Sequence, residues 1–294
     1  MASSDVVVAC ADLDAALAFY TDELGFRLLS IFPADDPAVA TLDGHRLSVR
    51  LERSGPAAVV DGTWQRGRAG MHYRDLISDR LGGHFIASHI RIPDGGPVPD
   101  YVHYHEIQFQ MIYCYKGWVR VVYEDQGPPF VLRAGDCVLQ APGIRHRVLE
   151  SSANLEVVEV GSPAAHLTCV DHELSLPTAE VRPDREFGGQ RFVRHVAAEA
   201  DWQPWRIDGF ENRDTGISGA TNDLAGANVV RPIGRTSLRV DIELAFVFVL
   251  VGSATKDAAA LTAGDSFVVD GVLELGELSD ELELLLVTLP PRAD

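Results

Sequence analysis

The sequence predicts a mainly β protein in three parts: a small α+β module, followed by two related β-rich units. Three observations support this fold class. The order strand, helix and three strands is recognisable in residues 1–55. Short runs of β-branched and aromatic residues, separated by turn residues, fill residues 73–168, which is typical of a sandwich or barrel. A similar succession returns in residues 201–292, so this last unit is predicted to be a repeat of the one before it.

The composition excludes several classes of function. The 294 residues carry a net charge of −18, which argues against nucleic acid or an anionic membrane as a partner, because both require a basic face. No signal peptide is recognisable, and the longest apolar run, residues 244–251, is far shorter than the ~20 residues that cross a bilayer. Four widely spaced cysteines without a CxxC pair fit reduced thiols. We therefore expect a cytoplasmic protein with no nucleic-acid or membrane partner.

Residues 1–55 contain one clear helical pattern between strand-like runs. Asp12 or Asp14 is placed to cap the helix, and Gly25 is placed to end it. An Asp-Gly pair at residues 43–44 predicts the turn of a hairpin. The predicted strands are residues 6–10, 27–32, 38–43 and 47–52.

The segment DLDAALAFYTDELGFRLL within this module resembles the vicinal-oxygen-chelate (glyoxalase and bleomycin-resistance) superfamily. In that superfamily two such modules normally form one site, with metal ligands on the first and last strands. Only one module is present here, and those strands offer Cys10 and Glu52. The resemblance therefore implies a structural or dimer-forming module rather than a catalytic one. An open sheet exposes an edge or face that a second chain would cover, so we expect a homodimer.

The two β-rich units align segment by segment. Residues 54–72, before the first unit, are predicted to be a linker, and residues 169–200, between the two units, a connector. The aligned segments are 87–93 with 225–232, 113–119 with 247–254, 132–140 with 261–269, and 155–163 with 282–290. In this alignment His103, His105, Gln110 and His146 correspond to Leu238, Val240, Ala245 and Leu275. The second unit is therefore predicted to keep the scaffold without a metal site.

Three histidines of the first unit form a candidate metal site. His103 and His105 are two residues apart in a predicted strand, so their imidazoles point to the same face. His146 lies in the later run GDCVLQAPGIRHRV. Neutral imidazole is the commonest transition-metal ligand, and three converging rings suit iron, zinc, nickel or copper.

The spacing around these histidines resembles the two motifs of the cupin superfamily. The first motif, G(x)5HxH(x)3-4E(x)6G, is matched by Gly96, His103, His105, Gln110 and Gly117, with one extra residue after Gly96. The second, G(x)5PxG(x)2H(x)3N, is matched by Gly135, Pro142-Gly143 and His146, with alanine for the first proline and Glu150 for the asparagine. The resemblance implies a bicupin of two jelly-roll barrels, of which the first binds one divalent metal per chain.

Gln110 stands where the cupin motif has a glutamate ligand. A neutral amide is a weaker ligand than a carboxylate, so three histidines, with or without Gln110, would hold the metal. The sequence then predicts a dication without a protein anion to offset it, which favours an anionic chelating substrate. Gln110 is accordingly a candidate both as a ligand and as a residue that tunes the reaction.

Strand parity predicts the wall of the pocket. Arg91 would reach a substrate carboxylate if His89 faces inward, and a surface ion pair is the alternative. Cys114 would face the barrel interior, as a buried inert thiol. The residues predicted to contact substrate are Tyr101, Gln108, Ile112, Cys114 and Val148.

Three-histidine cupins that cleave carbon–carbon bonds with O2 resemble this pattern. The resemblance implies a mononuclear dioxygenase for a small diketone, enolisable acid or phenolic ketone, with Fe(II) as the expected metal and Ni, Zn, Mn or Cu as alternatives. A metal-dependent isomerase or lyase that uses no O2 is a second hypothesis. A non-catalytic protein that binds a small molecule is a third.

Overall fold

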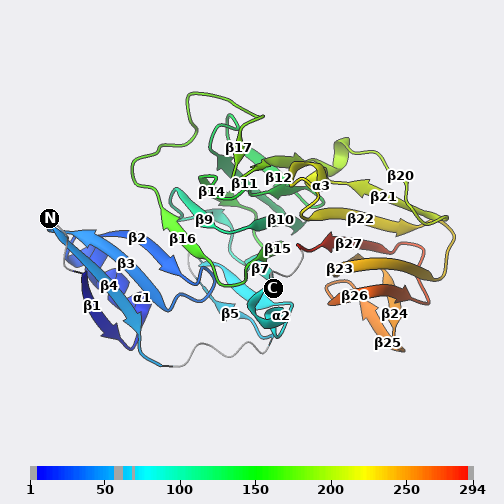
Figure 1. Cartoon of the computed structure of the whole chain (residues 1–294), viewed down its shortest axis with the longest axis horizontal. Coiled ribbons are helices and arrows are strands. Elements are labelled where there is room, and N and C mark those ends of the chain that lie inside the picture. Colours follow the sequence, from blue (N-terminus) through cyan, green and yellow to red (C-terminus); the bar gives the residue numbers. More distant parts are fainter. Residues whose placement is uncertain (1–4, 56–61, 68–69, 291–294) are drawn as a thin grey trace.

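The computed structural model describes residues 5–55, 62–67 and 70–290, and it is mainly β (Figure 1). Parts of the predicted linker, residues 56–61 and 68–69, lie outside the described residues. No helix within the described ranges has the length and apolar character needed to cross a bilayer. The strands form an N-terminal module, a first barrel and a second barrel in chain order.

The N-terminal module has the predicted strand–helix–three-strand order. Asp12 caps the helix, since its side chain accepts a hydrogen bond from the Ala15 backbone N–H at 2.9 Å. The first strand pairs in parallel with the last, while the other pairs are antiparallel. The elements are β1 (Asp5–Cys10), α1 (Leu13–Ala18), the π-helical turn η1 (Phe19–Glu23), β2 (Arg27–Phe32), β3 (Val39–Gly44) and β4 (Leu47–Arg53).

The hairpin turn between β3 and β4 lies two residues beyond the predicted one. His45 and Arg46 occupy the turn with φ of 54° and 65°, while Gly44 is the last residue of β3. A Cβ at Gly44 would lie 2.9 Å from the ring of Phe26. Glycine is therefore needed here for close packing against Phe26, not for the conformation of the turn.

The sheet of the N-terminal module continues into the first barrel. Strand β16 (Leu167–Val170) pairs with β2 on one side and with β9 (His103–Glu106) on the other. The edge of β2 is thus covered within the chain, and β1 is at the other end of the sheet. The homodimer stays a prediction. The rest of this sheet is formed by β14 (His146–Ser151), β11 (Trp118–Tyr123) and β12 (Phe130–Arg133), with β8 (Gly96–Pro97) beside β14.

A second sheet of seven strands closes the first barrel. Apolar side chains of both sheets, among them Ile90, Val121 and Val157, pack into one core between them. The sheet extends past the predicted limits of the unit, residues 73 and 168, because β5 and β19 join its two edges. Its order is β19 (Val193–His195), β13 (Cys137–Leu139), β10 (Phe109–Lys116), β15 (Leu155–Ser162), β7 (Ile86–Ile92), β6 (His72–Asp75) and β5 (Gln65–Arg66), and the short helix α2 (Arg80–Gly83) precedes β7.

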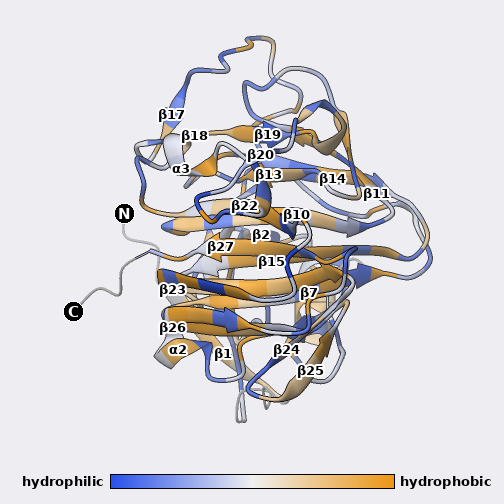
Figure 2. Cartoon of the chain, turned by 90° about the vertical axis from the view of Figure 1, so that its right-hand side faces the viewer, coloured by the Kyte–Doolittle hydropathy of each residue, from blue (hydrophilic) through white to orange (hydrophobic). Residues whose placement is uncertain are grey.

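The second barrel packs its main sheet against the seven-stranded sheet of the first. Phe109 and Met111 of β10 share a buried cluster with Phe246 and Phe248 of β23. Figure 2 shows the apolar strands of this region stacked one above another. The six-stranded sheet has the order β20 (Gln203–Pro204), β21 (Phe210–Asp214), β22 (Gly226–Pro232), β27 (Glu283–Thr288), β23 (Leu238–Val251) and β26 (Ser266–Leu275). The smaller elements are α3 (Ile217–Ala220), the pair β24 (Ser253–Lys256) and β25 (Ala259–Thr262), and, in the connector, the hairpin β17 (Glu186–Phe187) and β18 (Gln190–Arg191) with the 3₁₀ turn η3 (Ala197–Glu199).

Strand register supports the predicted repeat. Leu238 of β23 pairs with Leu275 of β26, as His103 of β9 pairs with His146 of β14. Leu238, Val240, Ala245 and Leu275 are all buried in the core of the second barrel. Where the first barrel carries histidines, the second therefore carries packed apolar side chains.

Candidate metal centre and its pocket

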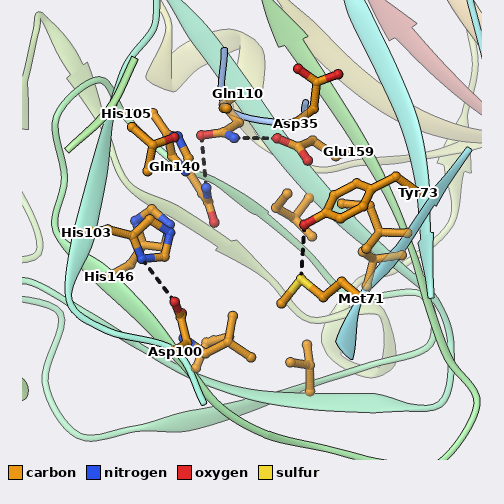
Figure 3. A pocket seen from close by; sticks show the side chains of 18 of the residues that line it. Asp35, Met71, Tyr73, Asp100, His103, His105, Gln110, Gln140, His146 and Glu159 are labelled. Atoms are coloured by element: carbon orange, nitrogen blue, oxygen red, sulfur yellow. Dashed lines mark hydrogen bonds and ion pairs between the residues drawn. The ribbon is translucent and has the colours of Figure 1, made fainter. Parts of the chain in front are cut away.

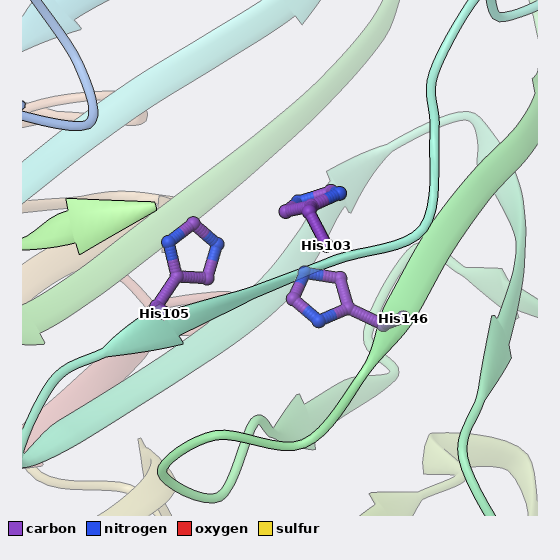
Figure 4. A group of neighbouring side chains, drawn as sticks. All are labelled: His103, His105 and His146. Carbon is purple, nitrogen blue, oxygen red and sulfur yellow. The ribbon is translucent and has the colours of Figure 1, made fainter. Parts of the chain in front are cut away.

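Three imidazoles meet inside the first barrel. His103 and His105 extend from the same face of β9, and His146 begins β14, directly opposite His103 (Figure 4). Each residue offers one ring nitrogen that lies within 4.8 Å of a ring nitrogen of both other residues. Among the described residues, this is the one group of three or more His, Cys, Asp or Glu side chains close enough to hold a metal ion.

Hydrogen bonds to the rings leave the same nitrogen of each histidine free. Nδ1 of His103 donates to the Tyr101 carbonyl at 2.9 Å, and Nδ1 of His146 donates to the Ile144 carbonyl at 3.1 Å. A carbonyl oxygen can only accept, so both Nδ1 atoms carry the proton. Nδ1 of His105 lies 2.9 Å from Oγ1 of Thr168, a hydroxyl that can accept in the same way. The Nε2 lone pairs of His103 and His146 are thus left for a metal, as is that of His105 when the Thr168 hydroxyl accepts, and the oxygen partners hold the rings in position.

The environment keeps the rings of His105 and His146 neutral. Burial, followed by the neighbouring rings His103, His146 and His166, holds the pKa of His105 well below its ordinary value of 6.5. Burial, with His103 nearby, has the same effect on the pKa of His146. A neutral imidazole keeps its lone pair near neutral pH, so these residues fit a divalent first-row metal.

The rings open into a cavity of about 220 Å³ inside the first barrel (Figure 3). Its walls are mostly aliphatic, with Ile86, Ile90 and Ile112 among them, and a few polar groups converge on it. Such a mixture is typical of a site for a small organic molecule. Besides the three histidines, the polar groups are Asp35, Tyr73, Asp100, Tyr101, Gln110, Tyr123, Gln140, Glu159, His166 and Thr168.

Gln110 belongs to a chain of buried hydrogen bonds. Its Nε2 donates to Oε1 of Glu159 at 2.5 Å, and its Oε1 accepts from Nε2 of Gln140 at 3.0 Å (Figure 3). Gln140 in turn accepts from the Tyr123 hydroxyl at 2.7 Å. Both polar atoms of the Gln110 amide are therefore engaged within the protein. Its coordination of a metal stays a prediction.

Glu159 supplies the pocket with a carboxyl group that the cupin motif does not contain. It lies on β15, where it pairs with Ile112 of β10. Burial, only partly offset by the hydrogen bond from Gln110, raises the pKa of Glu159 to about 7. Asp35 and Asp100 also line the cavity. The cavity therefore contains carboxyl groups that the cupin motif does not supply.

The predicted pocket wall divides in two. Tyr101, Ile112 and Val148 line the cavity as expected. Gln108 precedes β10 and is exposed, so strand parity does not apply to it. Cys114 does share the parity of Gln110, but it is fully buried in the core of the first barrel, where burial raises the pKa of its thiol to about 12. Gln108 and Cys114 are not among the residues that line the cavity.

Arg91 faces away from the cavity, which corrects its predicted place. Ile90 and Ile92, its neighbours on β7, line the cavity and thus hold the inward positions. The guanidinium of Arg91 instead lies 4.1 Å from the ring centre of Trp64. Arg231 of the second barrel is stacked on Trp202 in the same manner, at 3.9 Å, which assigns both arginines to the scaffold.

Two further polar residues of the pocket, His166 and Asp35, also come from outside the motifs. His166 precedes β16, and its ring centre lies 5.3 Å from that of His105. Asp35 belongs to the N-terminal module, which also contributes Ile31 and Ala34 to the cavity. The sequence signal for His166 was weak, since it lies beyond the second motif, and nothing marked Asp35.

Comparisons with known proteins agree with this architecture. Residues 88–161 match the cupin domain family, and residues 4–109 match the glyoxalase/bleomycin resistance protein/dioxygenase superfamily. No curated protein sequence matches the chain.

Oxalate decarboxylases are similar in structure. An arginine-to-alanine variant from Bacillus subtilis is 15% identical over 80% of this chain and 76% of its own, with a TM-score of 0.53. The Lactobacillus farciminis enzyme in complex with formate is 13% identical over 81% and 86%, with a TM-score of 0.54.

At such identities the likeness establishes the fold of two barrels and no more. The metal-site geometry and the polar groups of the cavity are features of this chain's own residues.

Proposed function

We propose that this bicupin, a cupin-superfamily protein with a glyoxalase-like module at its N-terminus, is a mononuclear metal-dependent enzyme for a small oxygenated substrate. The observation that carries the proposal is the set of three Nε2 atoms, each on a ring whose Nδ1 faces an oxygen partner. Three ring nitrogens this close together beside a cavity are the arrangement that a metal ion requires.

The first candidate reaction is the O2-dependent cleavage or oxidation of a diketone, an enolisable acid or a phenolic ketone. A divalent metal, with Fe(II) as first choice, would polarise the substrate oxygens and bring O2 close to them. The aliphatic wall, with Ile86, Ile90 and Ile112, excludes water from the substrate skeleton. The chain Tyr123–Gln140–Gln110–Glu159 holds polar groups in fixed positions around it.

Metal analysis of untagged protein tests the proposal. Wild-type protein is expected to retain about one equivalent of a first-row metal, and the double variant His103→Ala/His146→Ala is expected to lose it. Metal well below one equivalent in wild type that does not change in the double variant would contradict the proposal. A histidine tag must be absent, because it binds the same ions.

Glu159 favours a second candidate, a metal-dependent isomerase or lyase that needs no O2. A carboxyl group whose pKa is about 7 can both accept and donate a proton near neutral pH. Glu159 would then move a proton on a substrate whose oxygens are polarised at the histidine site. Oxygen consumption with a panel of candidate substrates separates the two reactions: turnover under strict anaerobiosis favours the second, and O2 uptake matched to product favours the first.

A further inference from the structure

Two acceptor atoms in the wall of the cavity have no hydrogen-bond partner. Nε2 of His166 is buried and unpartnered, while its Nδ1 donates to the Pro163 and Ala164 carbonyls, each at 3.2 Å. The proton is therefore on Nδ1, and Nε2 offers a lone pair. Oδ1 of Asp35 is likewise buried without a partner, although Oδ2 receives a hydrogen bond from Arg80 at 2.5 Å. Buried polar atoms without partners are rare in folded proteins and usually mark a missing ligand or water.

Both residues line the cavity that contains the three histidines, and His166 is only 4% exposed. Figure 3 places Asp35 and Glu159 across the cavity from His103 and His146. Asp35 is also held firmly. Arg80 bridges it to Asp75, whose Oδ2 accepts from Nε of Arg80 at 3.0 Å, and the side chains of all three are less than one-fifth exposed.

The electrostatics of this side of the cavity favour a donor over an acceptor. The Asp35 carboxylate acts on both neighbours, since it contributes to raising the pKa of Glu159 and partly opposes the lowering of the pKa of His166 by burial. One cation, Arg80, faces two carboxylates, Asp35 and Asp75. A substrate carboxylate placed here would meet like charge, whereas a hydroxyl or ammonium group would satisfy the unpaired atoms.

We propose that Asp35 and His166 form an acceptor subsite, which binds a hydroxyl or ammonium group of the substrate while its chelating oxygens face the three histidines. This inference rests on the proposed metal-dependent function, and it makes the N-terminal module part of the substrate site. The substrate then has chelating oxygens for the three histidines, an apolar part that fits Ile86, Ile90 and Ile112, and a hydrogen-bond donor for Asp35 and His166.

Mandelate derivatives test this arrangement. Their α-hydroxy acid chelates metals, and their aromatic ring carries a 4-substituent at the opposite end of the compound. Protein loaded with Co(II) is titrated with 4-hydroxymandelate, 4-(aminomethyl)mandelate and 4-methoxymandelate, and the cobalt absorption spectrum and calorimetry report binding. We expect the hydroxyl or the ammonium compound to bind about tenfold more tightly than the methoxy compound, which cannot donate. Which of the two binds more tightly identifies the donor.

The variants Asp35→Asn and His166→Phe assign the effect to the subsite. Each is expected to reduce the preference for the donor compounds at least threefold while the cobalt content stays the same. His195→Phe is the matched control, since His195 is also buried with an unpartnered Nε2 but does not line the cavity. His195→Phe is expected to keep the wild-type preference for the donor compounds.

Three results would overturn the acceptor subsite. The first is equal affinity for all three compounds, and the second is no binding of any of them to cobalt-loaded protein. The third is a preference for the donor compounds that survives in both Asp35→Asn and His166→Phe. Loss of cobalt from wild-type protein would instead contradict the metal-dependent function itself, so the two failures are distinguishable.

Discussion

At the residue scale, the charge of the pocket is set by side chains outside the recognised motifs. Gln110 alone predicts a dication without a protein anion. Glu159 adds a carboxyl group to the same pocket, where it accepts a hydrogen bond from Gln110 at 2.5 Å. The histidines could be predicted because their motif is local in sequence. Glu159 is 49 residues from Gln110, and the contact depends on the pairing of β10 with β15.

Thr168→Val tests whether the partners of Nδ1 prepare the metal site. The change removes the hydroxyl that faces His105 Nδ1 at 2.9 Å and keeps the side-chain volume almost the same. We expect metal affinity to fall about 10- to 100-fold, as is usual when such a partner is lost. A chelator competition titration measures it.

Thr215→Val is the control, because Thr215 is equally buried and donates to the Ala227 carbonyl at 2.8 Å, but does not line the cavity. Its metal affinity is expected to stay at the wild-type value. An equal loss in both variants would show a general effect on stability instead.

Glu159→Gln is expected to stabilise the metal-free protein at high pH. The folded-state pKa of about 7 lies above the ordinary 4.5, so ionised Glu159 disfavours folding, fully above pH 7 and not at all below pH 4.5. The variant removes this penalty. Its free energy of unfolding should exceed that of wild type by on the order of 1–3 kcal/mol at pH 8, and the gain should vanish as the pH falls toward 4.5.

Urea denaturation at several pH values measures this difference. Glu243→Gln, at an exposed position of β23, controls for the loss of one negative charge. A gain for Glu159→Gln that does not depend on pH would exclude titration of Glu159 as its cause.

At the element scale, strand parity predicted side-chain direction well within strands and failed at their ends. It placed His103, His105 and Ile112 correctly toward the interior. It failed for Gln108, which lies outside β10, and the inward position considered for Arg91 depended on a choice of face for β7 that the sequence could not decide. The hairpin of β3 and β4 shows the same limit, because the Asp-Gly pair predicted a turn where Gly44 instead packs against Phe26.

Gly44→Ala tests this explanation of the hairpin. The new Cβ would lie 2.9 Å from the Phe26 ring, and overpacking of this kind typically costs about 1–3 kcal/mol of stability. Gly219→Ala in α3 is the control, since its Cβ would have no atom within 4 Å. Thermal unfolding of both variants should show destabilisation of Gly44→Ala only. Equal stability of the two would mean that Phe26 moves aside freely.

At the scale of the whole molecule, the repeat could be predicted because both units keep the same order of strands and turns. The contact between the barrels could not, because it joins β10 to β23 across a large sequence separation. Phe248 lies at the centre of this contact, fully buried, with its ring centre 5.0 Å from that of Tyr115 and 5.9 Å from that of His89. The place of the N-terminal module beside the cavity could not be predicted from the sequence either.

Phe248→Ala is expected to destabilise the first barrel from within the second. Loss of a buried phenylalanine typically costs about 3–5 kcal/mol. Circular dichroism and release of bound cobalt, followed in the same urea titration, should shift together to lower urea. Val272→Ala, at a position 40% exposed, should change neither. Cobalt release that stays at the wild-type midpoint would show that the barrels unfold independently.

The pairing of β2 with β16 has a consequence for synthesis of the chain. Translation completes β2 at Phe32, but its neighbour begins only at Leu167. At usual elongation rates the interval is on the order of ten seconds. Throughout that time the nascent module presents the edge of β2 that does not pair with β3 to the ribosome surface, to chaperones and to other nascent chains. Because β16 also pairs with the histidine-bearing strand β9, the emergence of residues 167–170 both shields this edge and completes the support of the metal-binding strand.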